Sequence, residues 1–167
     1  MADARRRGVL DRASGKRVYI CAGAGGVGKT TTAAALALGL AARGGRVAVV
    51  TIDPAPRLAD ALGLEALAPE PQPVDTSALV AGGLKMRGQL WAMRLDPKRT
   101  LDDLIGRLAP DRAAREEILG NPIYRELSSA VAGTQELSAV AKLYELRHEG
   151  DFDAIVLDTP PAWRAAG

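Results

Sequence analysis

The stretch Gly23-Ala24-Gly25-Gly26-Val27-Gly28-Lys29-Thr30 fits the pattern G-x-x-x-x-G-K-[ST], and it decides the fold that the sequence predicts. Its glycines allow the backbone to turn tightly, so that consecutive N–H groups point toward phosphate oxygens. Lys29 would place a positive charge on the β- and γ-phosphates, and the Thr30 hydroxyl would bind Mg²⁺. The eight residues therefore predict a site for a nucleoside triphosphate.

The residues on either side of this loop predict a strand before it and a helix after it. Arg17–Cys21 is a short apolar run that predicts a buried strand. Thr31–Leu38 is rich in alanine and leucine, which favour a helix. A helix that begins at the loop adds its positive dipole end to an anion site. The context is the one that a phosphate-binding loop requires.

A second pattern lies in the same letters. Gly23, Gly25 and Gly28 also spell G-x-G-x-x-G, the dinucleotide fingerprint. Asp53, at the end of the next predicted strand, lies where an acid would bind a ribose hydroxyl. Lys29 and Thr30 argue against this alternative, because a triphosphate site with Mg²⁺ needs that pair and a dinucleotide site does not. We therefore favour the triphosphate.

Composition is that of an ordinary globular protein. The chain has 167 residues, of which 47% are hydrophobic and 25% charged, enough to bury the core of one domain. A net charge of +2 gives no argument for nucleic acid, and no nucleic acid is expected as a partner. The single cysteine, Cys21, excludes an internal disulfide or a C-x-x-C metal site. Residues 1–16 lack the apolar core of a secretory signal and are expected to form a flexible polar leader, so the expected compartment is the cytoplasm.

Strands and helices alternate along the rest of the chain, which predicts an α/β fold with a mostly parallel sheet flanked by helices. Further strands are expected at Val47–Ile52, Leu90–Leu95 and Ala154–Leu157, and the first two strands should be parallel. A short helix is expected at Arg57–Leu64, followed by a long irregular connection between Pro69 and Gly88. A helical insertion is expected at about 97–149, before the last strand. One helix face in this insertion would be formed by Leu137, Val140, Ala141 and Tyr144.

Two aspartates follow predicted strands, at the sheet edge where open α/β folds place ligands. Asp158 ends the last apolar strand, a pattern typical of a carboxylate that supports Mg²⁺ directly or through water. Asp53 ends the second strand. Both residues also suit simple turns, so the pattern gains weight only from the phosphate loop upstream.

These residues together resemble a known family. The phosphate loop, Thr51-Ile52-Asp53-Pro54-Ala55 with Leu58–Leu62 after it, and Asp158-Thr159-Pro160-Pro161 are similar to the ArsA-type ATPases. That group contains arsenite-pump ATPases and the targeting ATPases of tail-anchored membrane proteins, and it is related to the ParA- and MinD-like proteins. The resemblance runs from about Arg17 to Pro161 and identifies residues 17–167 as a partial P-loop ATPase domain.

The resemblance implies roles for named positions. Lys29, Asp53 and Asp158 would be catalytic, with Asp53 orienting the attacking water in switch I and Asp158 coupling the metal to motion in switch II. Thr30 and Asp158 would bind the metal. The phosphates of ATP would be bound by Gly25, Gly26, Val27, Gly28, Lys29, Thr30 and Thr31. The helices between Leu95 and Asp153 would match a helical subdomain that carries an apolar client groove in the targeting branch, although apolar residues at such spacing usually form core.

Two departures from the family stand out. Position 24, where the family has a lysine that reaches the partner's nucleotide across a dimer, holds Ala24. The chain also stops soon after Asp158, so the sheet is expected to be incomplete at its C-terminus, without an adenine-recognition segment and with an edge and apolar surface exposed.

The leading expectation is an ATP-binding, Mg²⁺-dependent ATPase whose nucleotide-gated dimer moves anions or membrane-protein clients. It would pair with an ArsA-like subunit, as a homo- or heterodimer, and act in the cytoplasm beside a membrane-associated partner. Arsenite is doubtful as the anion, because a thiolate site needs several cysteines. The alternatives are a nucleotide-binding regulatory subunit with little hydrolysis and a ParA/MinD-like positioning ATPase.

Overall fold

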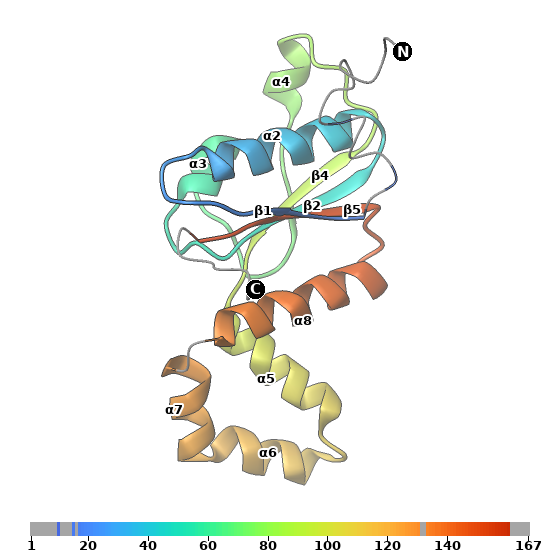
Figure 1. Cartoon of the computed structure of the whole chain (residues 1–167). Coiled ribbons are helices and arrows are strands. Elements are labelled where there is room, and N and C mark those ends of the chain that lie inside the picture. The colour runs from blue at the N-terminus through green and yellow to red at the C-terminus, as the bar shows by residue number, and fades with distance from the viewer. Residues whose placement is uncertain (1–9, 11–14, 16, 131–132, 161–167) are drawn as a thin grey trace, which may run out of the picture.

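The computed structural model describes residues 10, 15, 17–130 and 133–160, and almost all of the expected leader lies outside these residues. Figure 1 shows a sheet with helices on both faces. In chain order the elements are β1 (Val18–Cys21), α2 (Lys29–Ala42), β2 (Arg46–Thr51), α3 (Arg57–Leu62), β3 (Gln72–Pro73), α4 (Ser77–Ala81), β4 (Gln89–Arg94), α5 (Pro97–Leu108), α6 (Arg112–Gly120), α7 (Pro122–Ala130), α8 (Thr134–His148) and β5 (Ala154–Asp158).

The sheet has the strand order β1-β5-β2-β4-β3. The first four of these strands are parallel, and the short β3 runs antiparallel to β4. The last strand of the chain therefore lies between the first two, with Asp158 in register with Cys21 on one side and Thr51 on the other. The mostly parallel α/β fold expected from the sequence is confirmed.

Two apolar layers cover the sheet. In β2, Val47 and Val49 pack on the side of α2, whereas Ala48 and Val50 pack on the side of α8. This alternation is that of a strand buried on both faces. Helix α2 contributes its fully buried Ala33, Ala37 and Ala41, small residues that let the helix lie close to the sheet. That close packing positions the N-terminus of α2 at the end of β1.

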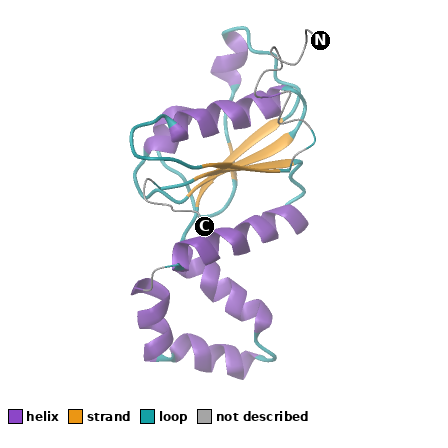
Figure 2. Cartoon of the chain, viewed as in Figure 1, coloured by secondary structure: helices purple, strands orange, loops and turns teal. Residues whose placement is uncertain are grey.

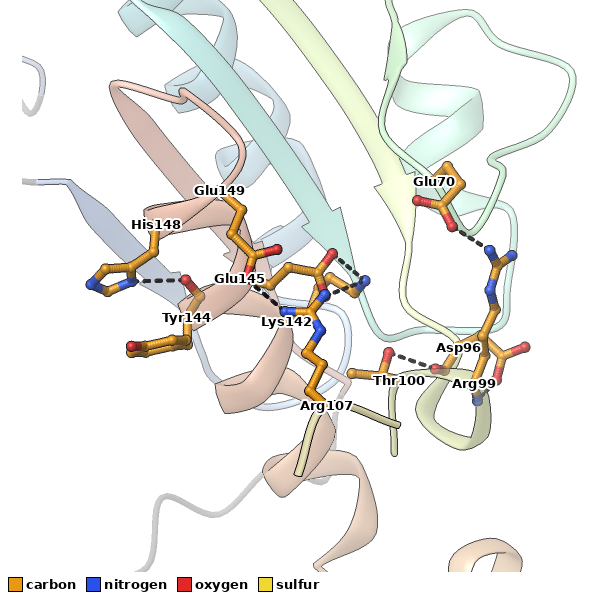
Figure 3. Close-up of polar contacts among 10 residues, drawn as sticks. All are labelled: Glu70, Asp96, Arg99, Thr100, Arg107, Lys142, Tyr144, Glu145, His148 and Glu149. Atoms are coloured by element: carbon orange, nitrogen blue, oxygen red, sulfur yellow. Dashed lines mark hydrogen bonds and ion pairs between the residues drawn. The ribbon is translucent and has the colours of Figure 1, made fainter. Parts of the chain in front are cut away.

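Helices α5 to α8 form the region between β4 and β5, and α6 and α7 stand away from the sheet beyond α5 and α8 (Figure 2). Polar contacts join α5 to α8. Figure 3 shows Arg107 of α5 reaching Glu145 of α8 and Glu149, the residue after α8; the distances are 3.1 and 2.8 Å. Lys142 is almost buried beside them and pairs with Glu145 at 2.9 Å. His148 ends α8, with Nδ1 2.9 Å from the Tyr144 carbonyl oxygen.

The structure corrects three details predicted from the sequence. Strand β1 lies at the sheet edge, so Val18 and Ile20 are 39% and 58% exposed rather than buried. The connection between Pro69 and Gly88 is not wholly irregular, because it contains β3 and α4. The expected apolar face of α8 points outward: Leu137, Val140 and Tyr144 are exposed, and the buried face is instead Ser138, Ala139, Lys142 and Leu146.

No helix in the described parts of the chain is long and apolar enough to cross a membrane.

Candidate nucleotide site

The phosphate loop connects β1 to α2 at the carboxyl ends of the parallel strands. Gly26 and Gly28 have φ values of +76° and +82°, which L side chains rarely adopt, so glycine is needed at both positions. Gly28 is also the N-terminal cap of α2, and no side chain caps this end. The first amide groups of the helix lack intrahelical partners, which makes them available to an anion.

A cavity of about 510 Å³ opens at this helix end. Six of its lining residues come from the loop and the first turn of α2, and three more come from the segment after β2. The lining residues are Gly25, Gly26, Gly28, Lys29, Thr30, Thr31, Asp53, Arg57, Asp60 and Thr159. Val27 is not among them, and its side chain is 63% exposed. The position of the cavity is that of a phosphate site at a helix N-terminus.

Lys29 turns back over the loop. Its Nζ donates to the Ala24 carbonyl oxygen at 2.8 Å, and this contact lies at the surface. The hydrogen bond is to a neutral acceptor, so a phosphate oxygen would be a stronger partner for the same ammonium group.

Asp158 lies beneath the loop and is 1% exposed. Its Oδ2 accepts hydrogen bonds from the hydroxyls of Thr30 at 2.9 Å and Thr51 at 3.1 Å. Its Oδ1 is buried without a hydrogen-bond partner among the residues that the structure describes. Thr30 and Asp158, the two predicted metal ligands, are thus in direct contact.

Burial raises the pKa of Asp158. The Thr30 and Thr51 hydrogen bonds oppose this rise, the Asp53 carboxylate adds to it, and Lys29 lowers it. A buried carboxylate with an unpartnered oxygen is costly unless a cation or water meets it. The donor set of a hydroxyl, a carboxylate and nearby phosphates suits Mg²⁺, which usually keeps several waters and takes only one or two protein oxygens. The residues therefore fit the ion that the loop implies.

Asp53 is held by its own segment. Its Oδ1 accepts from the Ala55 amide at 3.0 Å, and its Oδ2 pairs with the Arg57 guanidinium. Its backbone amide donates to the Thr51 hydroxyl at 3.2 Å. The Thr51 hydroxyl therefore connects the segment of Asp53 to the carboxylate of Asp158.

Four residues of the site were not predicted: Thr51, Arg57, Asp60 and Thr159. Thr51 and Thr159 each lie within two residues of a predicted aspartate, a spacing that places them at the same strand ends. Arg57 is four residues after Asp53 and is the first residue of α3. Cys21 contributes its carbonyl, which accepts from the Thr159 hydroxyl at 2.9 Å, and burial raises the pKa of its thiol, with Asp158 adding to the rise.

A sequence profile described as anion-transporting ATPase, or ArsA ATPase, matches residues 16–165. The chain belongs to this family. As a member of the ArsA ATPases it has the family's P-loop NTPase fold, and the expected resemblance is confirmed. ATP binding and ATPase activity are thereby supported at the level of the family.

Three curated relatives of this ArsA-family chain carry the name ATPase. It is 31% identical to ATPase GET3 of Malassezia globosa over 92% of this chain and 41% of that protein. It is 30% identical to ATPase GET3A of Arabidopsis thaliana and 32% identical to ATPase ARSA2 of Chlamydomonas reinhardtii, in each case over 96% of this chain and 39% of the relative. The chain spans about two fifths of the length of these curated relatives.

Proposed function

We propose that this chain binds ATP with Mg²⁺ in the cavity at the N-terminus of α2 and hydrolyses it within an ArsA-like dimer. The observation that carries the proposal is the contact between the Thr30 hydroxyl and Asp158, because the second carboxylate oxygen is buried and unpartnered below the phosphate loop. A nucleotide-binding loop joined to an acidic strand end is the arrangement that phosphoryl transfer requires.

In this proposal, Lys29 exchanges the Ala24 carbonyl for phosphate oxygens, and the amides from Gly25 to Thr31 bind the remaining oxygens. Thr30 and Asp158 would hold Mg²⁺, which neutralises charge on the phosphates when bound. Asp53 orients the attacking water, since its carboxylate borders the same cavity and its backbone is fixed through Thr51.

The dimer would couple ATP hydrolysis to the movement of anions or of membrane-protein clients. The description of the family names anion transport. Client handling is supported by exposed apolar side chains on two neighbouring helices, α7 and α8: Ile123, Leu127, Leu137, Val140 and Tyr144. Exposed apolar groups of this kind mark sites for apolar partners. The proposal places the protein in the cytoplasm, beside a membrane-associated partner.

A second candidate is a nucleotide-binding regulatory subunit that hydrolyses little. Ala24 favours it, because the family lysine at that position is absent and a cation supplied in trans contributes about 10³–10⁵ in rate by analogy with arginine fingers. Replacing the side chain, as Ala24→Lys, should then raise the turnover of a homodimer. Unchanged turnover in that variant would contradict this explanation.

The test measures ATP binding by fluorescence titration and phosphate release in the presence of Mg²⁺. The wild-type chain should bind ATP, Lys29→Ala should bind it far more weakly, and Asp53→Asn should bind it without turning it over. Binding without turnover in the wild type would favour the regulatory candidate. Equal binding by the wild type and Lys29→Ala would overturn the assignment of the cavity.

A further inference from the structure

Arg57 is the first residue of α3 and lines the phosphate cavity together with Lys29, Thr30 and Asp53. Its guanidinium pairs with Asp53 Oδ2. The two partners differ in exposure: the Arg57 side chain is 59% exposed, whereas that of Asp53 is 11% exposed. The aspartate is therefore fixed in the wall of the cavity, and the arginine reaches it from the solvent side.

The cavity has few positive side chains to neutralise the phosphates of a bound nucleotide. Among the described residues that line it, Lys29 and Arg57 are the two cationic side chains, and Asp53 and Asp60 are acidic. Position 24 offers only a backbone carbonyl, which Lys29 contacts. A triphosphate carries more negative charge than one lysine neutralises, so a second cation in the cavity has a clear partner when a nucleotide arrives.

We propose that Arg57 is a phosphate-contacting residue that leaves Asp53 for the terminal phosphate of a bound nucleoside triphosphate. This inference rests on the proposed function. The planar guanidinium suits the exchange, because its forked donors match a carboxylate and a phosphate equally well. No covalent bond is made or broken in this step; the Arg57–Asp53 ion pair is exchanged for an ion pair with phosphate.

The exchange has a second effect. Asp53 Oδ2 loses its cationic partner when Arg57 moves, while Oδ1 stays bound to the Ala55 amide. The freed oxygen can then accept a hydrogen bond from a water next to the terminal phosphate. Arrival of the phosphate and release of Asp53 are thereby the same event, and a nucleoside diphosphate, which has no terminal γ-phosphate, would leave the ion pair in place.

A purely structural ion pair makes different predictions. An exposed ion pair contributes little to stability and has no reason to distinguish nucleotides. Arg99 and Glu70 form such a pair outside the cavity, with side chains 52% and 57% exposed. Arg99→Ala is therefore the matched control for Arg57→Ala.

The experiment titrates each variant with fluorescent analogues of ATP and ADP in Mg²⁺. Arg57→Ala should lose about tenfold more affinity for the triphosphate than for the diphosphate, as expected for one charge-assisted contact. Arg99→Ala should leave both affinities unchanged. Arg57→Gln keeps the aliphatic stem and provides the same test if Arg57→Ala does not fold. Equal losses for both nucleotides, or no loss, would overturn the proposal.

A double-mutant cycle tests the exchange itself. Asp53→Asn removes the competitor for Arg57, so it should strengthen triphosphate binding in the wild-type background and lose most of that gain in the Arg57→Ala background. An equal gain in both backgrounds would show that Asp53 only repels the phosphates and would overturn the exchange. If the wild-type chain and Lys29→Ala both bind no nucleotide, the proposed function fails as well. If the wild type binds ATP and Arg57→Ala has the same ratio of ATP to ADP affinity as the wild type, this inference alone fails.

Discussion

Asp158 Oδ2 accepts hydrogen bonds from two threonine hydroxyls, those of Thr30 and Thr51. Thr51 also contacts the segment of the second aspartate, Asp53. The Thr51 side chain is 1% exposed, donates to Asp158 at 3.1 Å and accepts from the Asp53 amide at 3.2 Å. A hydroxyl is the smallest side-chain group that can donate and accept at once. At the scale of single residues, Thr51 is therefore the link between the two aspartates.

Thr51→Val should be destabilising although it preserves shape. It removes both hydrogen bonds and leaves the buried Asp53 amide without its partner, a loss of about 1–3 kcal/mol in the free energy of unfolding. Urea unfolding measures the change, with Thr51→Ser as the control that keeps the hydroxyl. A valine variant as stable as the serine variant would show that the two hydrogen bonds contribute nothing.

The residues of the site differ in how far sequence could predict them. Lys29 and Thr30 belong to one contiguous motif, so the sequence pattern alone identifies them as candidate site residues. Asp158 could be identified because it ends an apolar strand. Thr51 and Arg57 could not be assigned in this way. Their positions in the site depend on the register of β5 beside β2 and on where α3 begins, and both are set by packing across the whole sheet.

At the scale of elements, polar contacts join the helices between β4 and β5. Tyr124 of α7 donates its phenol to Asp102 Oδ1 of α5 at 2.7 Å, and Lys98 binds the same carboxylate. Burial, with Asp102 adding to the effect, raises the pKa of Tyr124 to about 12. This contact ties α7 to α5 where few other contacts do.

The raised pKa of Tyr124 predicts an alkaline transition. The stability that this tyrosine contributes is full below its ordinary pKa of about 10 and is lost as pH rises through about 12, because the unfolded chain releases the proton first. Tyr124→Phe should remove a late step from an absorbance titration of tyrosinate. Tyr144→Phe, at an exposed position of α8, is the control. A step near pH 12 that is unchanged in Tyr124→Phe would contradict the prediction.

Element types were more predictable than element surroundings. The helix over Thr134–His148 follows from its spacing of apolar residues, yet its apolar residues Leu137, Val140 and Tyr144 face outward. Periodicity identifies a face but not its partner, and here the buried side of the helix is formed by Ser138, Ala139, Lys142 and Leu146. The edge position of β1 could not be predicted for the same reason, because the local sequence of a strand does not determine the order of strands in the sheet.

At the scale of the whole molecule, one edge of the parallel sheet has an apolar surface. Strand β1 pairs only with β5 among the described strands, and the alternation that packs Tyr19 and Cys21 toward α2 places Val18 and Ile20 on the opposite face. Parallel strands are usually covered on both faces. An open strand with exposed apolar side chains favours association with other chains.

We expect the isolated chain to self-associate through this edge. Ile20→Lys should shift sedimentation toward the monomer, because a lysine on an edge strand opposes strand pairing. Leu79→Lys, at an exposed position of α4 on the other layer, is the control and should sediment as the wild type does. Association that is unaffected by Ile20→Lys would show that another surface is responsible.

The central position of β5 has a consequence for how the protein is made. The Thr159 hydroxyl and the Cys21 carbonyl, which meet in the finished site, are separated by 138 residues in sequence. Pairing at such separation is slow, because most of the chain must be closed into a loop first. During synthesis, β1 and β2 leave the ribosome long before the strand that belongs between them. The phosphate loop therefore emerges early, but Asp158, the carboxylate beneath it, follows only when the last described strand has been translated.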